Sequence, residues 1–158
     1  MNEKSNEPAK QSAEPDPSAA QDQPPYREVS QEELEQILKA HRKWVESDGK
    51  EGNQADLIKA NLEKADLFQA NLQEADLMGA NLQGADLLVA NLQKANLAGA
   101  QLQGANLNGA NLRGAELKHT NLEGAESLTQ EQLDEACGDE KTKLPPGLSV
   151  KPCPDDSK

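Results

Sequence analysis

The chain has 158 residues, of which 35% are apolar, and it contains only one Trp, one Tyr and one Phe. Its 28 acidic residues outnumber its 16 basic ones, for a net charge of −12, whereas a protein that binds nucleic acid through its phosphates needs a basic surface. No apolar run approaches the ~18–20 residues that cross a bilayer, and the first residues lack the apolar core of a secretory signal. We therefore expect neither direct nucleic-acid binding nor membrane insertion, and a cytoplasmic location.

Residues 1–29 are mostly polar, with five prolines and almost no large apolar side chain. Such a segment buries too little surface to offset the entropy that it would lose on ordering. We predict a disordered tail over 1–29. A tail of this kind also permits an export signal, so a translocated bacterial effector is one alternative for the function.

A capping helix is predicted over 30–49. Ser30 and Glu33 form a capping box at its start, and Gly49 follows its end. We expect this helix to close one end of the structure that follows it, with Trp44 lying over that end and His41 packing rather than binding a ligand. Its apolar face recurs at helical spacing and consists of Leu34, Ile37, Leu38, His41, Trp44 and Val45.

A strict period of five residues runs from Ala55 to Gly124. Ala stands two residues before each Leu, with Thr120 as the exception, and an Asp, Asn, Gln or Glu lies between the two. A repeat of this strictness defines a domain, which we assign to 53–126. Its predicted core is the set of fourteen leucines, Leu57, Leu62, Leu67, Leu72, Leu77, Leu82, Leu87, Leu92, Leu97, Leu102, Leu107, Leu112, Leu117 and Leu122.

A period of five fits neither an α-helix nor a flat strand. On a helix each Leu would advance by about 140° and never build one face, and on a strand an odd spacing sends successive leucines to opposite sides. Within one unit, Ala and Leu are two residues apart, so a short extended segment points both the same way. Four such segments joined by turns close a square of about 20 residues, with Leu filling its centre.

The repeated units resemble the consensus of the pentapeptide-repeat family, A-(D/N)-L-x-x. The resemblance implies an all-β solenoid, a right-handed quadrilateral β-helix of about 3.5 coils, with a helical N-terminal lid and a short C-terminal helix plus extended tail. Residues 40–52 and 128–153 resemble the lead-in and trailing segments of many bacterial members.

A C-terminal cap and tail are predicted over 127–158. Thr129 and Gln132 form a second capping box, which predicts a short helix over about 130–137. The remaining tail is expected to be extended and to pack along the end of the coil. Cys137 and Cys153 either remain free thiols, as a reducing compartment favours, or form a disulfide, since tail and helix can approach each other.

The outward positions of the repeats carry the candidate interaction surface. Positions twenty residues apart stack on one face, and the outward apolar residues fall in the first two coils on two opposite faces. Four explanations remain open: burial under the N-terminal segment, a self-association surface that would make a homodimer, a binding surface for another protein, or a chance grouping. These residues are Ile58, Phe68, Met78, Leu88 and Val89.

No set of residues in the sequence is arranged for catalysis. His119 has no second His or nucleophile fixed near it by spacing, and the stacked pairs Asp56/Asp76 and Asp66/Asp86 offer too few oxygens for a calcium site. We therefore expect no catalytic residue, no cofactor and no metal, and a non-enzymatic protein-binding or scaffold module whose partner the sequence does not name.

A second function is implied by the resemblance alone. Some pentapeptide-repeat proteins resemble a DNA duplex in size and charge and bind type II topoisomerase, so a DNA-mimicking modulator of DNA gyrase is an alternative. Here the acidic excess is spread evenly over the chain rather than concentrated in the coil, and Leu occupies the central position throughout without insertions. Both features count against that alternative.

Overall fold

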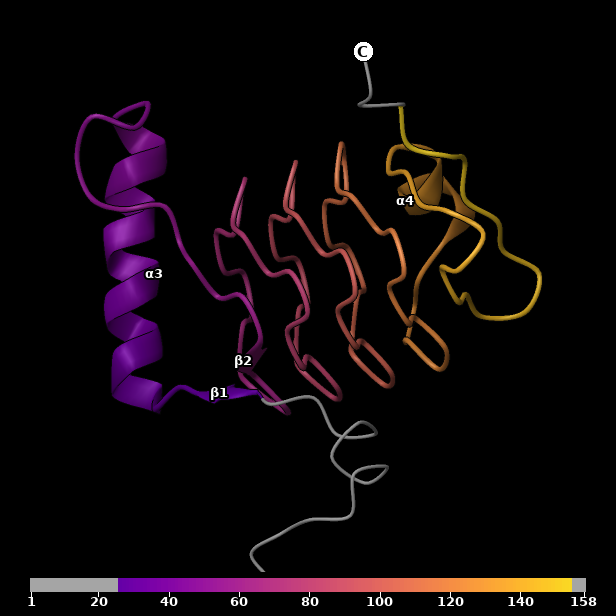
Figure 1. The fold of residues 1–158 in the computed structure, drawn as a ribbon, viewed down its shortest axis with the longest axis horizontal. Helices are drawn as coiled ribbons and strands as arrows, with labels where there is room; N and C mark the ends of the chain where they lie inside the picture. Colours follow the sequence, from indigo (N-terminus) through magenta and orange to yellow (C-terminus); the bar gives the residue numbers. More distant parts are fainter. Residues whose placement is uncertain (1–25, 155–158) are drawn as a thin grey trace, which may run out of the picture.

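The computed structural model describes residues 26–154, so the predicted disorder of the tail lies almost wholly outside the described residues. In chain order the elements are β1 (Arg27–Glu28), α3 (Gln31–Glu46), β2 (Ala60–Asn61) and α4 (Gln130–Asp134). Figure 1 shows the repeats as a stack of similar turns, with α3 lying across one end and α4 with the C-terminal segment at the other.

Parallel bridges between residues twenty apart build this stack. They connect, for example, Asp56 to Asp76 and Asn61 to Asn81, and a new bridge occurs at every fifth residue. One turn therefore has four sides of five residues each. We name the four faces by the residues that begin their stacks: face A (Asp56, Asp76), face B (Asn61, Asn81), face C (Asp66, Asp86) and face D (Asn71, Asn91).

The fourteen leucines of the repeats fill the centre of the stack, and none is more than 2% exposed. Most of the repeat alanines are buried beside them, and Thr120, which replaces one Ala, is also fully buried. The Thr120 hydroxyl donates to the Leu97 carbonyl at 2.7 Å, so its burial leaves no unsatisfied polar group. Small residues beside a leucine stack explain how a chain with three aromatic residues in total holds a core.

The same three backbone hydrogen bonds recur between successive turns. On face C, the Asp86 N–H donates to the Ala65 carbonyl, and the Leu67 and Gln69 N–H groups donate to the carbonyls of Asp86 and Leu88, each at 2.9 Å. Each side contributes only one bridge before the chain turns, so the sides are extended segments rather than long strands.

The residue before each Leu stabilises the turn that follows it. The Asp66 carboxylate accepts a hydrogen bond from the Phe68 N–H at 3.1 Å, and the Asn71 side chain accepts one from the Gln73 N–H at 3.1 Å. A short side chain with an acceptor oxygen reaches the N–H two residues on. This contact explains why Asp and Asn dominate that position.

Every corner of the coil lies in the left-handed region of backbone space, whether or not it is glycine. Lys59, with φ of 56°, and His119, with φ of 59°, adopt the same conformation as Gly79, with φ of 67°. Lys, Gln, Val and His rarely adopt positive φ, so their presence at these positions gives no sign of this conformation in the sequence. Closing a square with five-residue sides fixes the backbone there, and the side chain has to tolerate it.

The N-terminal end is closed by β1 and α3 together. The Glu33 N–H donates to the Ser30 Oγ at the helix start, and Leu34 and His41 are buried against the coil. β1 pairs in parallel with β2 in the register Arg27 to Ala60, so the ordered domain begins before residue 30 and the predicted boundary of the tail at 29 was too late.

His41 contacts the first turn directly, and Trp44 lines a hollow beside Gln73 and Glu74 of the same turn. The Nδ1 of His41 accepts from the Ala55 N–H at 2.9 Å, and its Nε2 lies 2.9 Å from the Gln73 carbonyl, to which it donates as a neutral imidazole. The Trp44 ring stacks on the His41 ring, with centroids 5.7 Å apart.

The C-terminal end extends two faces beyond the repeats. α4 ends at Asp134, earlier than the predicted residue 137, with Glu135 as its cap. Cys137 then pairs with Glu116 on face A, and Lys143 pairs with Asn121 on face B. The Gln132 amide donates to the carbonyls of Leu107 and Ala110 at 2.8 and 2.9 Å, which fastens α4 to the last regular turn.

Replacing Leu87 in the middle of the stack by Ala should lower the free energy of unfolding by about 2–5 kcal/mol, because the rigid turns above and below cannot collapse into the cavity. Leu88→Ala is the matched control, since its side chain points outward and is half-buried, and it should cost under about 1.5 kcal/mol. Urea unfolding measures both. Equal losses at the two positions would contradict the inward leucine stack.

The stability of the N-terminal end should depend on His41. Burial lowers the pKa of His41 below its ordinary value of 6.5, although the Gln73 carbonyl and the nearby Glu74 carboxylate act in the opposite direction. As the pH falls below about 6.5, His41 binds a proton more readily in the unfolded chain than in the folded one. The free energy of unfolding is therefore greatest above about pH 6.5 and decreases as the pH drops below that value. Thermal unfolding between pH 7.5 and about pH 5 should show this loss, and His41→Gln should flatten the difference; an unchanged slope in that variant would exclude His41 as its source.

Candidate interaction surface

The five outward apolar residues lie on two opposite faces, so they do not form one patch. Ile58 and Met78 belong to face A, and Phe68, Leu88 and Val89 to face C. Phe68 and Val89 are each 49% exposed and Met78 is 41% exposed, whereas Ile58 and Leu88 are half-buried. Face C therefore carries the larger exposed apolar group.

Face C combines this apolar group with a row of carboxylates. Asp66 and Asp86 stack on adjacent turns, and each uses one oxygen to accept the N–H two residues on, at 3.1 Å in both cases. Phe68 and Leu88 stack alongside them. The face thus presents an apolar column beside an acidic one, which suits a ligand with apolar and basic groups.

Val89 occupies the corner next to this group in an unfavourable conformation. Its φ is 59°, and a β-branched residue in the left-handed region is an outlier. The side chain gains little burial in return, because it is half exposed. A strained and exposed apolar residue is the kind of feature that clusters at binding sites.

A groove of about 300 Å³ runs between α3 and the first turn of face C. One wall is formed by Leu38 and Arg42 of α3, and the other by the first side of face C and the corner that follows it. The lining residues are Leu38, Arg42, Asp66, Leu67, Phe68, Gln69, Ala70 and Asn71.

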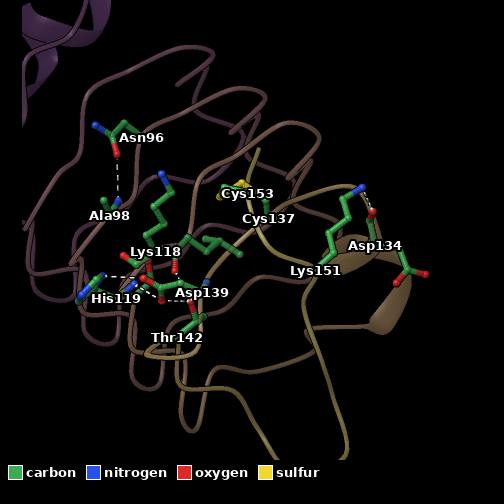
Figure 2. The surroundings of a disulfide bond; sticks show 12 residues. Asn96, Ala98, Lys118, His119, Asp134, Cys137, Asp139, Thr142, Lys151 and Cys153 are labelled. Atoms are coloured by element: carbon green, nitrogen blue, oxygen red, sulfur yellow. Dashed lines mark hydrogen bonds and ion pairs between the residues drawn. A yellow bond between two sulfur atoms is a disulfide. The ribbon is translucent and has the colours of Figure 1, made fainter. Parts of the chain in front are cut away.

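A disulfide bond cross-links the C-terminal end of the solenoid. Cys137 and Cys153 form a disulfide across a separation of 16 residues, which decides the alternative that the sequence left open. Beside it the Gly138 N–H donates to the Lys151 carbonyl at 2.8 Å, and the Cys153 N–H donates to the Gly138 carbonyl at 3.1 Å. Figure 2 shows this bond, and next to it the Lys151 ammonium reaching the Asp134 carbonyl at 2.9 Å.

His119 has a partner that the sequence did not indicate. Its Nδ1 lies 2.8 Å from the Asp139 carboxylate, and its backbone N–H donates to the same carboxylate at 3.0 Å. Figure 2 shows His119, Asp139 and Thr142 gathered at this corner. Partial desolvation raises the pKa of Asp139, whereas the hydrogen bonds from His119, Thr142 and Lys141 lower it. Together the hydrogen bonds outweigh the desolvation, so the pKa of Asp139 lies below its ordinary value.

The His119–Asp139 pair is part of a hydrogen-bonded cluster at the C-terminal end of the coil. Asp139 accepts hydrogen bonds from the backbone N–H groups of His119 and Lys141, and the Thr142 hydroxyl, 3.1 Å from the same carboxylate, donates to the Leu117 carbonyl at 2.6 Å. Together these contacts fasten the loop after Gly138 to the last turn. Their only sequence signal is the spacing of twenty residues between His119 and Asp139, which matches one turn of the coil.

Residues 26–154 contain neither a candidate metal site nor a candidate membrane-spanning helix. Within that range no group of three or more His, Cys, Asp or Glu side chains is placed to hold a metal ion. No helix in the same range is long and apolar enough to cross a membrane.

Reducing the disulfide should lower the free energy of unfolding by about 3 kcal/mol, because a closed loop of this length restricts the unfolded chain. Cys137→Ser with Cys153→Ser should unfold at the same urea concentration as the reduced wild type. The comparison is made with and without dithiothreitol. If an alkylating probe modifies both thiols before reduction, and the reductant does not change the unfolding of the wild type, the disulfide does not form in solution.

Val89→Gly should raise the free energy of unfolding by about 1 kcal/mol, because glycine adopts the left-handed corner without the penalty that a β-branched residue carries. Gly99→Val is the reciprocal control, since an added Cβ there meets nothing closer than 3.9 Å. Its free energy of unfolding should fall by about 1 kcal/mol, and that loss reports the cost of the left-handed backbone alone. Thermal and urea unfolding measure both variants. Destabilisation by Val89→Gly would show that Val89 packs in the free protein.

Comparison with known proteins identifies the repeat. The family described as pentapeptide repeats matches residues 53–88 and 90–126, in eight copies. No curated protein matches the chain. Among solved structures, the pentapeptide repeat protein Rfr23 from the cyanobacterium Cyanothece 51142 is 36% identical, with a TM-score of 0.50, over 61% of this chain and 68% of that one.

Two further solved structures are similar to this chain. A pentapeptide repeat protein from the Arabidopsis thaliana thylakoid lumen is 29% identical, with a TM-score of 0.44, over 61% of this chain and 55% of that one. QnrB1, a plasmid-mediated fluoroquinolone resistance protein, is 22% identical, with a TM-score of 0.29, over 54% of this chain and 58% of that one. The chain thus spans little more than half the length of these two proteins. Its repeats and its similarity to Rfr23 show that the chain belongs to the pentapeptide-repeat family.

Proposed function

We propose that the chain is a non-enzymatic module that binds another protein through face C of its coil. The observation that carries this proposal is Val89, which keeps an exposed apolar side chain in a left-handed corner where half of the repeats have glycine. Selection for stability alone favours glycine at such a position. Contact with a partner supplies a reason for the valine.

The rest of face C supports the same proposal. Phe68, the only Phe of the chain, is half exposed next to the stacked Leu88. A solenoid recognises partners through extended rigid faces of this kind. Asp66 and Asp86 add negative charge beside the apolar group, which favours a partner with a basic and apolar surface.

The disulfide bears on where this binding takes place. A structural disulfide is typical of oxidising compartments and is rare in the cytosol. The bond between Cys137 and Cys153 therefore favours an oxidising compartment over the cytoplasmic location that the sequence suggested.

The test is affinity capture from an extract of the source cells with the immobilised full chain, followed by mass spectrometry. Phe68→Asp with Leu88→Asp disrupts face C, and Ile58→Asp with Met78→Asp makes the same change on face A. We expect a protein that the wild type and the face A variant retain and the face C variant loses. Circular dichroism and thermal unfolding must first show that both variants fold.

Other outcomes contradict the proposal in distinct ways. Loss of the captured protein in the face A variant alone would move the binding surface to the opposite side. Retention by both variants would place it off the apolar columns. Enrichment of gyrase or topoisomerase subunits that both variants still retain would favour the DNA-mimic alternative.

A further inference from the structure

The first turn of the coil exposes a β-edge on face C. In every later turn of the face, the residue before Leu donates its N–H to the turn below and accepts through its carbonyl from that turn, as Asp86 does with Ala65 and Leu67. Asp66 has no turn below it. Within residues 26–154, the Asp66 N–H, the Asp66 carbonyl and the Phe68 carbonyl make no hydrogen bond.

Each of the other three edges of the first turn has at least one contact at this end, although within residues 26–154 the Asp56 N–H on face A and the Asn71 N–H and carbonyl on face D make no hydrogen bond. β1 pairs with the edge of face B, the Arg27 guanidinium donates to the Asp56 carbonyl on face A at 2.8 Å, and His41 holds the Gln73 carbonyl on face D. α3 passes the face C edge but leaves the groove between Leu38, Arg42 and that edge. An unpaired edge next to a groove lined by both apolar and polar side chains is an arrangement to which an extended peptide can add as a strand.

β1 provides a model for such pairing in the same molecule. It lies parallel to the edge of face B, and the Arg27 N–H donates to the Lys59 carbonyl at 2.7 Å. Glu28 stands beside Asn61, whose amide donates to it at 3.2 Å. Val29 follows and packs against the core. Two exposed residues and one apolar residue packed against the core are thus enough to pair with one side of the first turn.

We propose that the face C edge binds an extended segment of a partner protein as a parallel β-strand. The inference rests on the protein-binding function proposed above and names its site and the chemistry of its ligand. If the segment pairs with Asp66 as Ala65 pairs with Asp86 in the next turn, the Asp66 N–H donates to a carbonyl of the segment. The Asp66 and Phe68 carbonyls accept from two of its N–H groups, two residues apart.

The side chains along the edge define the segment that fits. The residue opposite Asp66 points outward about 4.8 Å from the carboxylate, so a Lys or Arg is favoured there. The next residue points inward between Leu38 and Leu67 and is apolar. The third stands outward beside Phe68, where an apolar or aromatic side chain adds cross-strand contact. The ligand is therefore a segment with a basic residue followed by two apolar ones.

Residues 1–25 of the chain do not match this pattern. Apart from Met1, their only apolar side chains are alanines and prolines. The chain also continues into β1, which already lies on the edge of face B. The occupant is therefore a segment of another protein.

The test begins with a random heptapeptide library displayed on phage and selected against the immobilised full chain. We expect peptides in which a basic residue precedes two apolar ones. Synthetic versions are then measured by fluorescence anisotropy with a scan of backbone N-methyl groups. Two N–H positions, two residues apart, should each lose about tenfold in affinity on methylation, because each removes one hydrogen bond. The methyl group between them should have little effect.

The matched protein variants are Asp66→Pro and Asp56→Pro. Each substitution removes a backbone N–H that makes no hydrogen bond in the free protein. Each also removes a carboxylate that accepts from the N–H two residues later. Only Asp66 lies on the proposed edge. Asp66→Pro should weaken peptide binding at least tenfold, and Asp56→Pro less than twofold. If Asp66→Pro fails to fold, the N-methyl scan on the wild type still tests the edge.

Three results would overturn the inference. These are the absence of any enriched peptide, uniform sensitivity along the N-methyl scan, or equal loss with the two proline variants. The inference and the proposed function fail separately. A cellular partner that Phe68→Asp with Leu88→Asp loses and Asp66→Pro retains would keep the face C function and refute strand addition.

Discussion

The closure of a square turn in twenty residues is the constraint on which the structure depends. A five-residue side leaves one residue at each corner, and its backbone must enter the left-handed region. All fourteen corners do so, seven of them without glycine. The strain of about 1 kcal/mol or more at each such corner is offset by a buried Leu and by the hydrogen bonds between turns. The repeated leucine therefore stabilises a backbone that its neighbours, taken alone, do not favour.

The same constraint fixes the chemistry of the position before Leu. The turn leaves the N–H two residues later without a backbone acceptor, and Asp66 and Asn71 accept that N–H through their side chains. Asp and Asn are equivalent for this purpose, so the fold leaves the charge of each face free to vary. Faces A and C begin with two stacked aspartates, whereas faces B and D have asparagines there. The charge of a face is thus a property that function can adjust without changing the coil.

The sequence predicted the repeats well and the segments outside them less well. The spacing of Leu and Ala was enough for the turn length, the inward side and the stacking of Asp56 on Asp76, because all three follow from one period. The right-handed sense of the coil stays a prediction. The conformation of the corners does not follow from residue preference, because the closure geometry of the turn decides it.

Outside the repeats the contacts depend on where a chain segment returns, which no period encodes. The end of α4 at Asp134 places Cys137 on Glu116 and brings it to Cys153. In the same way, β1 covers the edge of face B although its sequence belongs to a polar tail. The apolar group around Phe68 was visible in the sequence as a stacking pattern, but the open edge beside it was not.

The two ends of the solenoid differ in a way that favours recognition at only one of them. At the C-terminal end, a disulfide, the Asp139 cluster and two additional bridges cover faces A and B. At the N-terminal end, α3 is held by the His41 contacts and by packing of Leu34, while Leu38 and Arg42 line a groove beside the edge of face C. A covered edge prevents end-to-end association of solenoids. One edge left open beside Phe68 and two carboxylates allows a strand to add there, and the acidic charge selects which strand that is.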